Sequence, residues 1–353
     1  IDITVRRGDL STGNLHANQG GITLDAAGGI FTGSLTASNS SDPTAADITV
    51  TANHDLGFGT YGGSLMIFGA LSGADVSLNN LLGDVAIKDG FGASTVGNIQ
   101  IVADNIYLHD SLSAGNILLT AHHNTAAEAD TGQIFIDGSL NGNLTAVADV
   151  HFDAFEATLS GATASITVNG LVPDTSGASG FYDSSVTYNS LLVNSSGAGS
   201  AFHVSGSQLN GSPSAYGGAV SITSGTTRII GSDIHAGMLN LVSTLDYLDL
   251  INSSNLSFNT GSLSANTDVF IGNFEAGSAI LQNFTSLTVN ADGTAFIDSA
   301  SLAGGNLVVT ADTQFAVRSS TLNLASASFT ATGSNPDPVN APVSQIMDSS
   351  LSV

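Results

Sequence analysis

A short pattern recurs along the whole chain at intervals of about 23 residues, and this repeat restricts the fold more than any other feature. Residues 287–292 (LTVNAD) are followed twenty residues later by residues 307–312 (LVVTAD). An apolar landmark of this kind begins fifteen units, whose spacings run from 18 to 28 residues. A period of this size indicates a repeat architecture, in which each unit packs on its neighbours.

Each unit holds three short segments in which apolar and polar residues alternate, separated by Gly, Asn, Asp and Ser. Alternation with a period of two predicts strands, and the separating residues predict turns. No stretch has the pattern of a long amphipathic helix, and the units are too short for propeller blades. We therefore predict an all-β chain that forms a parallel β-helix, or β-solenoid, of about 15 rungs of 18–28 residues.

Two side-chain columns follow from this prediction. Alanine recurs four residues after the landmark, where we expect an inward corner that admits only a small side chain, at Ala26, Ala52, Ala103, Ala121, Ala148, Ala291 and Ala311. Asparagine precedes the landmark, where side-chain amides can stack in a ladder or close a turn, at Asn98, Asn116, Asn143 and Asn306. We expect one continuous solenoid over residues 1–353, without an internal domain boundary, and with loops at 38–47, 122–132, 171–183, 211–218 and 333–343.

The charge of the chain excludes several classes of partner. Five Lys and Arg stand against 29 Asp and Glu, so that the formal net charge is −24. A chain with so few cations cannot build the basic face that nucleic acids or anionic membrane surfaces require. There is no Cys, which excludes disulfide scaffolds and thiolate zinc sites. No apolar run is long enough to predict a membrane-spanning helix.

Residues 20–37 (GGITLDAAGGIFTGSLTA) and 115–121 (GNILLTA) resemble the repeats of filamentous haemagglutinin-type exoproteins. These are large bacterial adhesins of the two-partner secretion route. The resemblance implies a single right-handed parallel β-helix at the bacterial cell surface or outside the cell, a hand that the crossover rule also favours. From it we expect a structural or adhesive rod of an extracellular surface fibre, without catalysis, that contacts a host or neighbouring cell.

The first and last residues of the chain, residues 1–5 and 349–353, both lie in predicted rungs. Strand edges that end a solenoid pair with further strands unless they are covered. We therefore expect end-to-end partners, which are either adjoining rungs of a longer chain or copies of this chain. The second case describes a self-assembling head-to-tail filament subunit, an alternative to the fibre segment.

The tripeptide Arg7-Gly8-Asp9 lies between two predicted strands of the first rung, and hence on a turn. An exposed RGD sequence is typical of integrin-type recognition, which makes these residues a candidate receptor-binding site. A chance triplet is the simpler interpretation, because short motifs match by accident often.

Three carboxylates suggest a calcium site. Asp268, Asp292 and Asp312 each follow the landmark by five residues in three consecutive units, and Asp104 and Asp149 occupy the same position elsewhere. In register, such carboxylates lie about 4.8 Å apart, and hard oxygen ligands suit Ca²⁺. The alternative is a solvated column at a turn. No other cofactor is expected.

Other chemistry is weakly indicated. His122 and His123 lie near Glu128 and Asp130, but their spacing fits no zinc pattern. His109, His151 and His203 stand between apolar residues and are expected to point outward. A carbohydrate-active β-helix enzyme is the alternative from another class, since paired carboxylates can act as acid and base. We assign no catalytic residue, because the five cations are scattered over the units at Arg6, Arg7, Lys88, Arg228 and Arg318.

Overall fold

The computed structural model describes residues 1–42, 45–53, 63–80, 82–88, 94–123, 131–171, 178–197, 200–211, 217–252, 254–272, 278–333 and 344–353. Its contacts divide the chain into two compact units, Ile1–Val172 and Pro173–Val353, which are described separately below. The described residues form strands and no α-helix, and hence no helix that could cross a bilayer. The all-β prediction is therefore confirmed.

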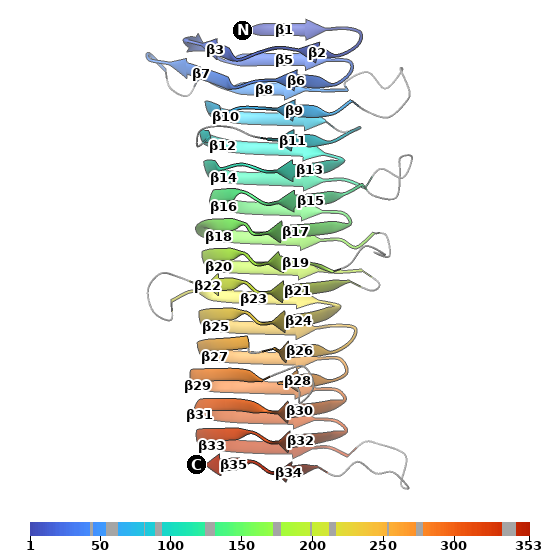
Figure 1. The fold of residues 1–353 in the computed structure, drawn as a ribbon, viewed down its shortest axis with the longest axis vertical. Helices are drawn as coiled ribbons and strands as arrows, with labels where there is room; N and C mark the ends of the chain where they lie inside the picture. Colours follow the sequence, from blue (N-terminus) through green and yellow to red (C-terminus); the bar gives the residue numbers. More distant parts are fainter. Residues whose placement is uncertain are drawn as a thin grey trace. The chain divides into compact units, whose positions relative to one another are not determined.

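In the first unit the strands belong to two sheets (Figure 1). Its first sheet contains β1 (Asp2–Val5), β3 (Leu15–Ala17), β4 (Gln19–Gly20), β5 (Ile22–Ala26), β7 (Leu35–Asn39), β8 (Ile48–Thr51), β10 (Leu71–Asn80), β12 (Ser94–Ala103), β14 (Leu112–Ala121), β16 (Ser139–Ala148) and β18 (Thr158–Val168). Its second sheet contains β2 (Leu10–Ser11), β6 (Ile30–Thr32), β9 (Leu65–Ile67), β11 (Val85–Ile87), β13 (Asn105–Leu108), β15 (Gln133–Ile136) and β17 (His151–Phe155).

The second unit repeats this arrangement. Its first sheet contains β20 (Ser185–Ser195), β22 (Gln208–Asn210), β23 (Ala219–Ser224), β25 (Asp233–Ser243), β27 (Ser254–Ala265), β29 (Ala279–Ala291), β31 (Ala300–Ala311), β33 (Thr321–Ala331) and β35 (Ser350–Ser352). Its second sheet contains β19 (Ser179–Tyr182), β21 (Ala201–Ser205), β24 (Thr226–Ile230), β26 (Leu248–Ile251), β28 (Val269–Ile271), β30 (Thr294–Asp298), β32 (Gln314–Arg318) and β34 (Gln345–Met347).

Within each unit, strands of one sheet pair in parallel with the equivalent strands of the next turn, except that β4 pairs with β7 in antiparallel fashion. In β12, β14 and β16, for example, Ile99 pairs with Ile117, which pairs with Leu144. The chain therefore alternates between the two sheets as it winds, which is the predicted parallel β-helix. Over the described residues the turns number about 12, slightly fewer than the 15 rungs predicted.

In many of its turns the structure joins two of the three predicted segments into one strand. Strand β14 runs from Leu112 to Ala121 through Gly115 and Asn116, which the sequence indicated as a turn. The parallel pairing continues beyond these residues, with a shift in register between β14 and β16 and another between β16 and β18. Gly142 lies in the second strand at this shift, with a φ of 154°. A β-bulge thus bends the strand where a turn was expected, and hydrogen bonding resumes beyond it.

Apolar side chains fill the interior in columns, one layer per turn. The seven alanines predicted to form an inward corner are all buried, with exposed fractions of 0 to 4%. Ala103, Ala121 and Ala148 are paired in register, as are Ala291 and Ala311. The inward corner is therefore confirmed, and a larger residue there would displace the layers on either side.

An amide ladder follows the outside of the first unit. The Asn116 Nδ2 atom donates to Asn98 Oδ1 at 2.7 Å, and Asn143 Nδ2 donates to Asn116 Oδ1 at 3.2 Å. Asp75 Oδ1 extends the ladder by accepting from Asn98 Nδ2 at 2.7 Å. The predicted asparagine ladder is confirmed for these residues. In the second unit Asn306 Oδ1 instead accepts from the Ser326 hydroxyl at 2.8 Å.

A buried serine follows each tight corner in part of the second unit. The Ser184 N–H donates to Ser207 Oγ at 3.0 Å, and the Ser207 N–H donates to Ser232 Oγ at 3.1 Å. The hydroxyls of these serines donate in turn to the carbonyl two residues before them. The residues just before the serines have left-handed backbones and are Asp183, Gly206 and Gly231, with φ of 50°, 60° and 56°. The serine hydroxyl thus pairs backbone groups that the corner leaves outside the ladder.

Candidate ligand groove on the second sheet

The outer surface of the second sheet carries several titratable side chains of the first unit, among them Asp84, Lys88 and His109. In β9, β13 and β15 two buried apolar residues flank one more exposed residue, as Ile106 and Leu108 flank Tyr107. Parallel pairing places Met66, Ala86, Tyr107 and Phe135 in one row across β9, β11, β13 and β15. The first sheet differs, because its outward rows consist mainly of uncharged side chains such as Thr23 and Thr49.

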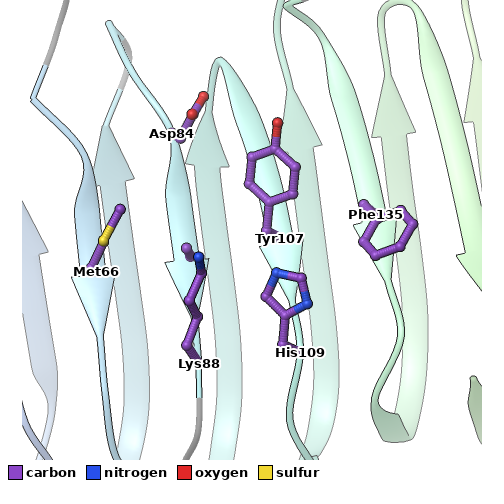
Figure 2. A pocket seen from close by; sticks show the side chains of 7 residues that line it. Met66, Asp84, Lys88, Tyr107, His109 and Phe135 are labelled. Atoms are coloured by element: carbon purple, nitrogen blue, oxygen red, sulfur yellow. The ribbon is translucent and has the colours of Figure 1, made fainter. Parts of the chain in front are cut away.

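These outward residues form a shallow groove with a volume of about 400 Å³ (Figure 2). The lining residues are Met66, Asp84, Ala86, Lys88, Tyr107, His109 and Phe135. Figure 2 shows the ring of Tyr107 on β13 next to that of His109, which follows this strand, with Phe135 on β15. The Tyr107 and His109 rings are parallel to within 6°, with their centroids 6.3 Å apart. The groove thus combines flat rings with one carboxyl and one ammonium group.

Asp84 precedes β11 and reaches the groove from the strand's beginning. Burial raises the pKa of its carboxyl, and a hydrogen bond from Asn105 Nδ2 at 2.9 Å partly opposes this effect. The backbone carbonyl of Asp84 accepts from Asn80 Nδ2 at 2.8 Å. These contacts hold Asp84 in place, so the carboxyl is a fixed hydrogen-bonding group and not a mobile surface side chain.

His109 is held by the neighbouring turn. Its Nδ1 atom lies 2.9 and 2.8 Å from the two carboxylate oxygens of Asp137. A carboxylate in this position favours the tautomer in which Nδ1 carries the proton, so that Nε2 is a hydrogen-bond acceptor. His109 and Asp137 remain accessible, with side-chain exposures of 29 and 34%. The pair therefore offers an oriented imidazole at the edge of the groove.

The second unit has its own charged and aromatic surface on the second sheet. His203, Arg228 and Asp249 are paired in register across β21, β24 and β26. Arg228 Nε donates to Asp249 Oδ2 at 3.2 Å. Beyond them Phe270 and Phe296 stack with centroids 5.0 Å apart and an interplanar angle of 1°. Burial raises the pKa of the Asp249 carboxyl, and Arg228 opposes this rise.

We expect His203 to make the stability of the protein depend on pH, because its surroundings lower the pKa of its imidazole. Its pKa is lowered from 6.5, first by burial and then by the charge of Arg228. As the pH falls through 6.5, His203 is therefore protonated in the unfolded chain before it is protonated in the folded protein. The folded protein loses stability over this range, until His203 is protonated in it as well. We expect His203→Gln to reduce the fall in melting temperature between about pH 7.5 and about pH 5.5. Calorimetry at both values would measure it, with the exposed His235→Gln as the matched control. Equal falls in the wild type and His203→Gln would contradict the assignment.

The RGD tripeptide lies on an exposed bend between β1 and β2, as predicted. The Asp9 carboxylate is already engaged, because its Oδ1 accepts from the Gly29 N–H of the next turn at 2.8 Å. A receptor would have to compete with this hydrogen bond. Recognition through Arg7, Gly8 and Asp9 stays a prediction.

The three carboxylates proposed to bind calcium do not form one column. Asp292 and Asp312 directly follow Ala291 and Ala311, which are paired. Ala265 pairs with Ala291, so Asn266 occupies that position in the turn before, and Asp268 lies two residues further on. Asp268 Oδ1 instead accepts from the Thr294 N–H at 2.6 Å. The predicted alignment is wrong for this residue, because Leu263 pairs with Val289 and not with Leu287.

The histidines lie in three different environments. Glu128 and Asp130, which the sequence placed near His122 and His123, lie outside the described residues. The His123 N–H donates to Asp149 Oδ2 at 2.9 Å. His109 and His203 are half-buried on the outer surface, whereas His151 is buried and its Nε2 lies 2.7 Å from Asp153 Oδ2. Within the part of the chain that the structure describes, no three His, Asp or Glu side chains are grouped as metal ligands.

Comparison with known proteins identifies no similar protein. No protein-family model, no curated protein and no solved structure matches this chain. The resemblance to filamentous haemagglutinin-type repeats thus stays a prediction from the sequence.

The groove itself was not predicted, although the sequence contains a signal for it. The apolar pairs Val85/Ile87, Ile106/Leu108 and Ile134/Ile136 enclose Ala86, Tyr107 and Phe135, and these enclosed residues form the row that lines the groove. Aligning the enclosed positions from turn to turn would have placed the two aromatic residues on adjacent strands.

Proposed function

We propose that this chain is a structural and adhesive segment of an extracellular bacterial surface fibre and that it performs no catalysis. The observation that carries the proposal is the regular parallel register within each unit, where interior layers and backbone hydrogen bonds repeat from turn to turn. Such stacking makes a stiff support, because bending it would disturb every layer at once. The similarity of residues 20–37 and 115–121 to adhesin repeats supports the location.

The charge of the chain is consistent with this role. A net charge of −24 with only five cations keeps like chains apart by repulsion and leaves few cleavage sites for trypsin-like proteases. An exposed fibre benefits from both properties. Its partners in this proposal are adjoining turns of a longer chain, or copies of this chain, and a host or neighbouring cell surface.

Immunogold labelling of intact bacteria that encode this protein tests the proposal. We expect label on thin fibres at the cell surface, with an antibody against a cytoplasmic protein as the negative control. Label that is found only after the cells are opened would contradict an extracellular role. Electron microscopy of the purified chain separates the two kinds of fibre component, since a self-assembling subunit gives continuous filaments and a fibre segment gives separate particles.

A carbohydrate-active enzyme is the second candidate, favoured by the groove in which Asp84, with its raised pKa, lies near aromatic side chains. A general acid requires a carboxyl whose pKa is raised, and burial shifts the pKa of Asp84 in that direction. Release of reducing ends from neutral or acidic polysaccharides by the wild type, and its loss in Asp84→Asn, would establish this activity in place of a purely structural role.

A further inference from the structure

The groove on the first unit has the composition of a sugar-binding surface. Tyr107 and Phe135 lie in register on adjacent strands, and both line the groove. The rings present apolar faces, while Asp84 and Lys88 supply polar groups at the rim. A pyranose ring has the complementary pattern, with C–H groups on its faces and hydroxyls around its edge. Ligand sites commonly combine an apolar lining with a few placed polar groups in this way.

The charges favour an uncharged ligand. The charges of the Asp84 carboxylate and the Lys88 ammonium offset each other in the groove, and the Asp137 carboxylate beside His109 would add to the repulsion of an anionic ligand. The rest of the chain is acidic, and its net charge of −24 repels anionic ligands. An acidic glycan would therefore approach against the field of the whole chain with a single lysine to receive it. A neutral saccharide avoids this repulsion and uses both groups as hydrogen-bonding partners.

Outward side chains beside the groove form a second row that crosses the strands of the second sheet. Lys88, His109 and Asp137 directly follow paired residues of β11, β13 and β15, and thus form a second row. Phe68 follows β9 and Phe155 ends β17, so that the same row has an exposed aromatic ring at each end. Their exposed fractions are 48 and 42%. Four steps between parallel strands span about 19 Å, which is long enough for an oligosaccharide and longer than a single sugar requires.

We propose that this groove, centred on Tyr107 and extended along the row from Phe68 to Phe155, binds a neutral oligosaccharide that lies across the strands. Tyr107 and Phe135 stack on the sugar faces, and Asp84 and Lys88 hydrogen-bond the hydroxyls. The inference supplies the adhesive part of the proposed function and rests on it for the biological role. Binding by the purified chain is independent of where the protein is located.

An array of neutral hexasaccharides of glucose, mannose and N-acetylglucosamine tests the proposal, with oligogalacturonate and heparin fragments on the same array. We expect the full chain to bind at least one neutral probe more tightly than either acidic one. Added salt should change the dissociation constant of that probe little, because no ion pair forms. Tighter binding of the acidic probes, or binding of no neutral probe, would overturn the proposal.

Variants locate the binding surface. We expect Tyr107→Ala to weaken binding of the neutral probe about tenfold in calorimetry. Phe270→Ala is the matched control, since Phe270 is a half-buried outward aromatic residue of the second unit, and it should bind as the wild type does. If Tyr107→Ala loses the β-sheet signal in circular dichroism, Lys88→Met replaces it as the test variant. This substitution keeps an unbranched aliphatic side chain and removes the ammonium group, so we expect it to weaken binding of the neutral probe. Unchanged binding in the folded variant would overturn the assignment to this groove, while surface labelling of cells would still test the proposed function.

Discussion

Replacing Phe258 by Ala is expected to destabilise the second unit by about 3–5 kcal/mol, because a large interior side chain leaves a cavity that its neighbours fill only in part. Phe258 in β27 and Phe284 in β29 are both buried, and their rings stack with centroids 5.7 Å apart and an interplanar angle of 16°. Removing one ring therefore also removes a contact between successive turns. The free energy of opening is measured by native-state hydrogen exchange at amides of β27 and β29.

Phe270→Ala provides the comparison on the outer surface of the same unit. Phe270 is half-buried and stacks on Phe296, so we expect its loss to cost about 1 kcal/mol. Equal effects of the two substitutions would show that the interior of the solenoid is loosely packed, contrary to the buried stack described above. Hydrogen exchange is preferred to a single melting curve, because repeat arrays do not always unfold in one step.

Gly142→Ala is expected to destabilise the first unit by about 2–4 kcal/mol, through backbone strain and a steric clash together. Gly142 has a φ of 154°, and a Cβ atom there would lie 2.1 Å from the backbone oxygen of Ala114. A backbone oxygen cannot rotate away as a side chain can, so the pairing of β14 with β16 must shift. Hydrogen exchange at the amides of these two strands measures the effect.

Gly231→Asn is the matched control, because it also places a side chain at a positive φ. Gly231 has a φ of 56°, and an added Cβ would have its nearest contact at 3.3 Å, to the Asn252 oxygen. Asp183 and Asn252 adopt the same left-handed conformation at other corners of this unit. We therefore expect Gly231→Asn to change stability by less than about 1 kcal/mol, since Asn tolerates this conformation. A loss as large as that of Gly142→Ala would contradict the steric explanation.

The sequence was sufficient to predict the parallel β-helix, because inward side chains must match from one turn to the next. The buried alanines and the ladder of Asn98, Asn116 and Asn143 follow from the same requirement, and both are confirmed. The register within a single turn was harder to predict. Leu287 and Val289 are both fully buried, so alternation alone cannot say which of them pairs with Leu263. A shift of two residues preserves every inward position, and this ambiguity misplaced Asp268.

Other features depend on backbone geometry that residue patterns do not specify. The glycine and asparagine residues at 115–116 and 142–143 are equally typical of a turn between two strands and of a bulge within one strand. Only the pairing shows that they lie within the continuous strands β14 and β16. The serines at the corners were treated as turn residues, although their hydroxyls bond buried backbone groups. The groove requires residues of four turns at once, so its prediction needs the correct register of all four.

In the second sheet, the residues that maintain the fold are different from the outward residue that they enclose. In β13 the buried Ile106 and Leu108 maintain the fold, while Tyr107 between them faces away from the core. At the same position of other turns the chain carries Met66, Ala86, Phe135 and Asp153 on equivalent backbones. Mutation there can change the outer surface without repacking the interior. A lineage carrying this fold can therefore vary that surface one turn at a time at a small cost in stability, about 1 kcal/mol for a stacked ring such as that of Phe270.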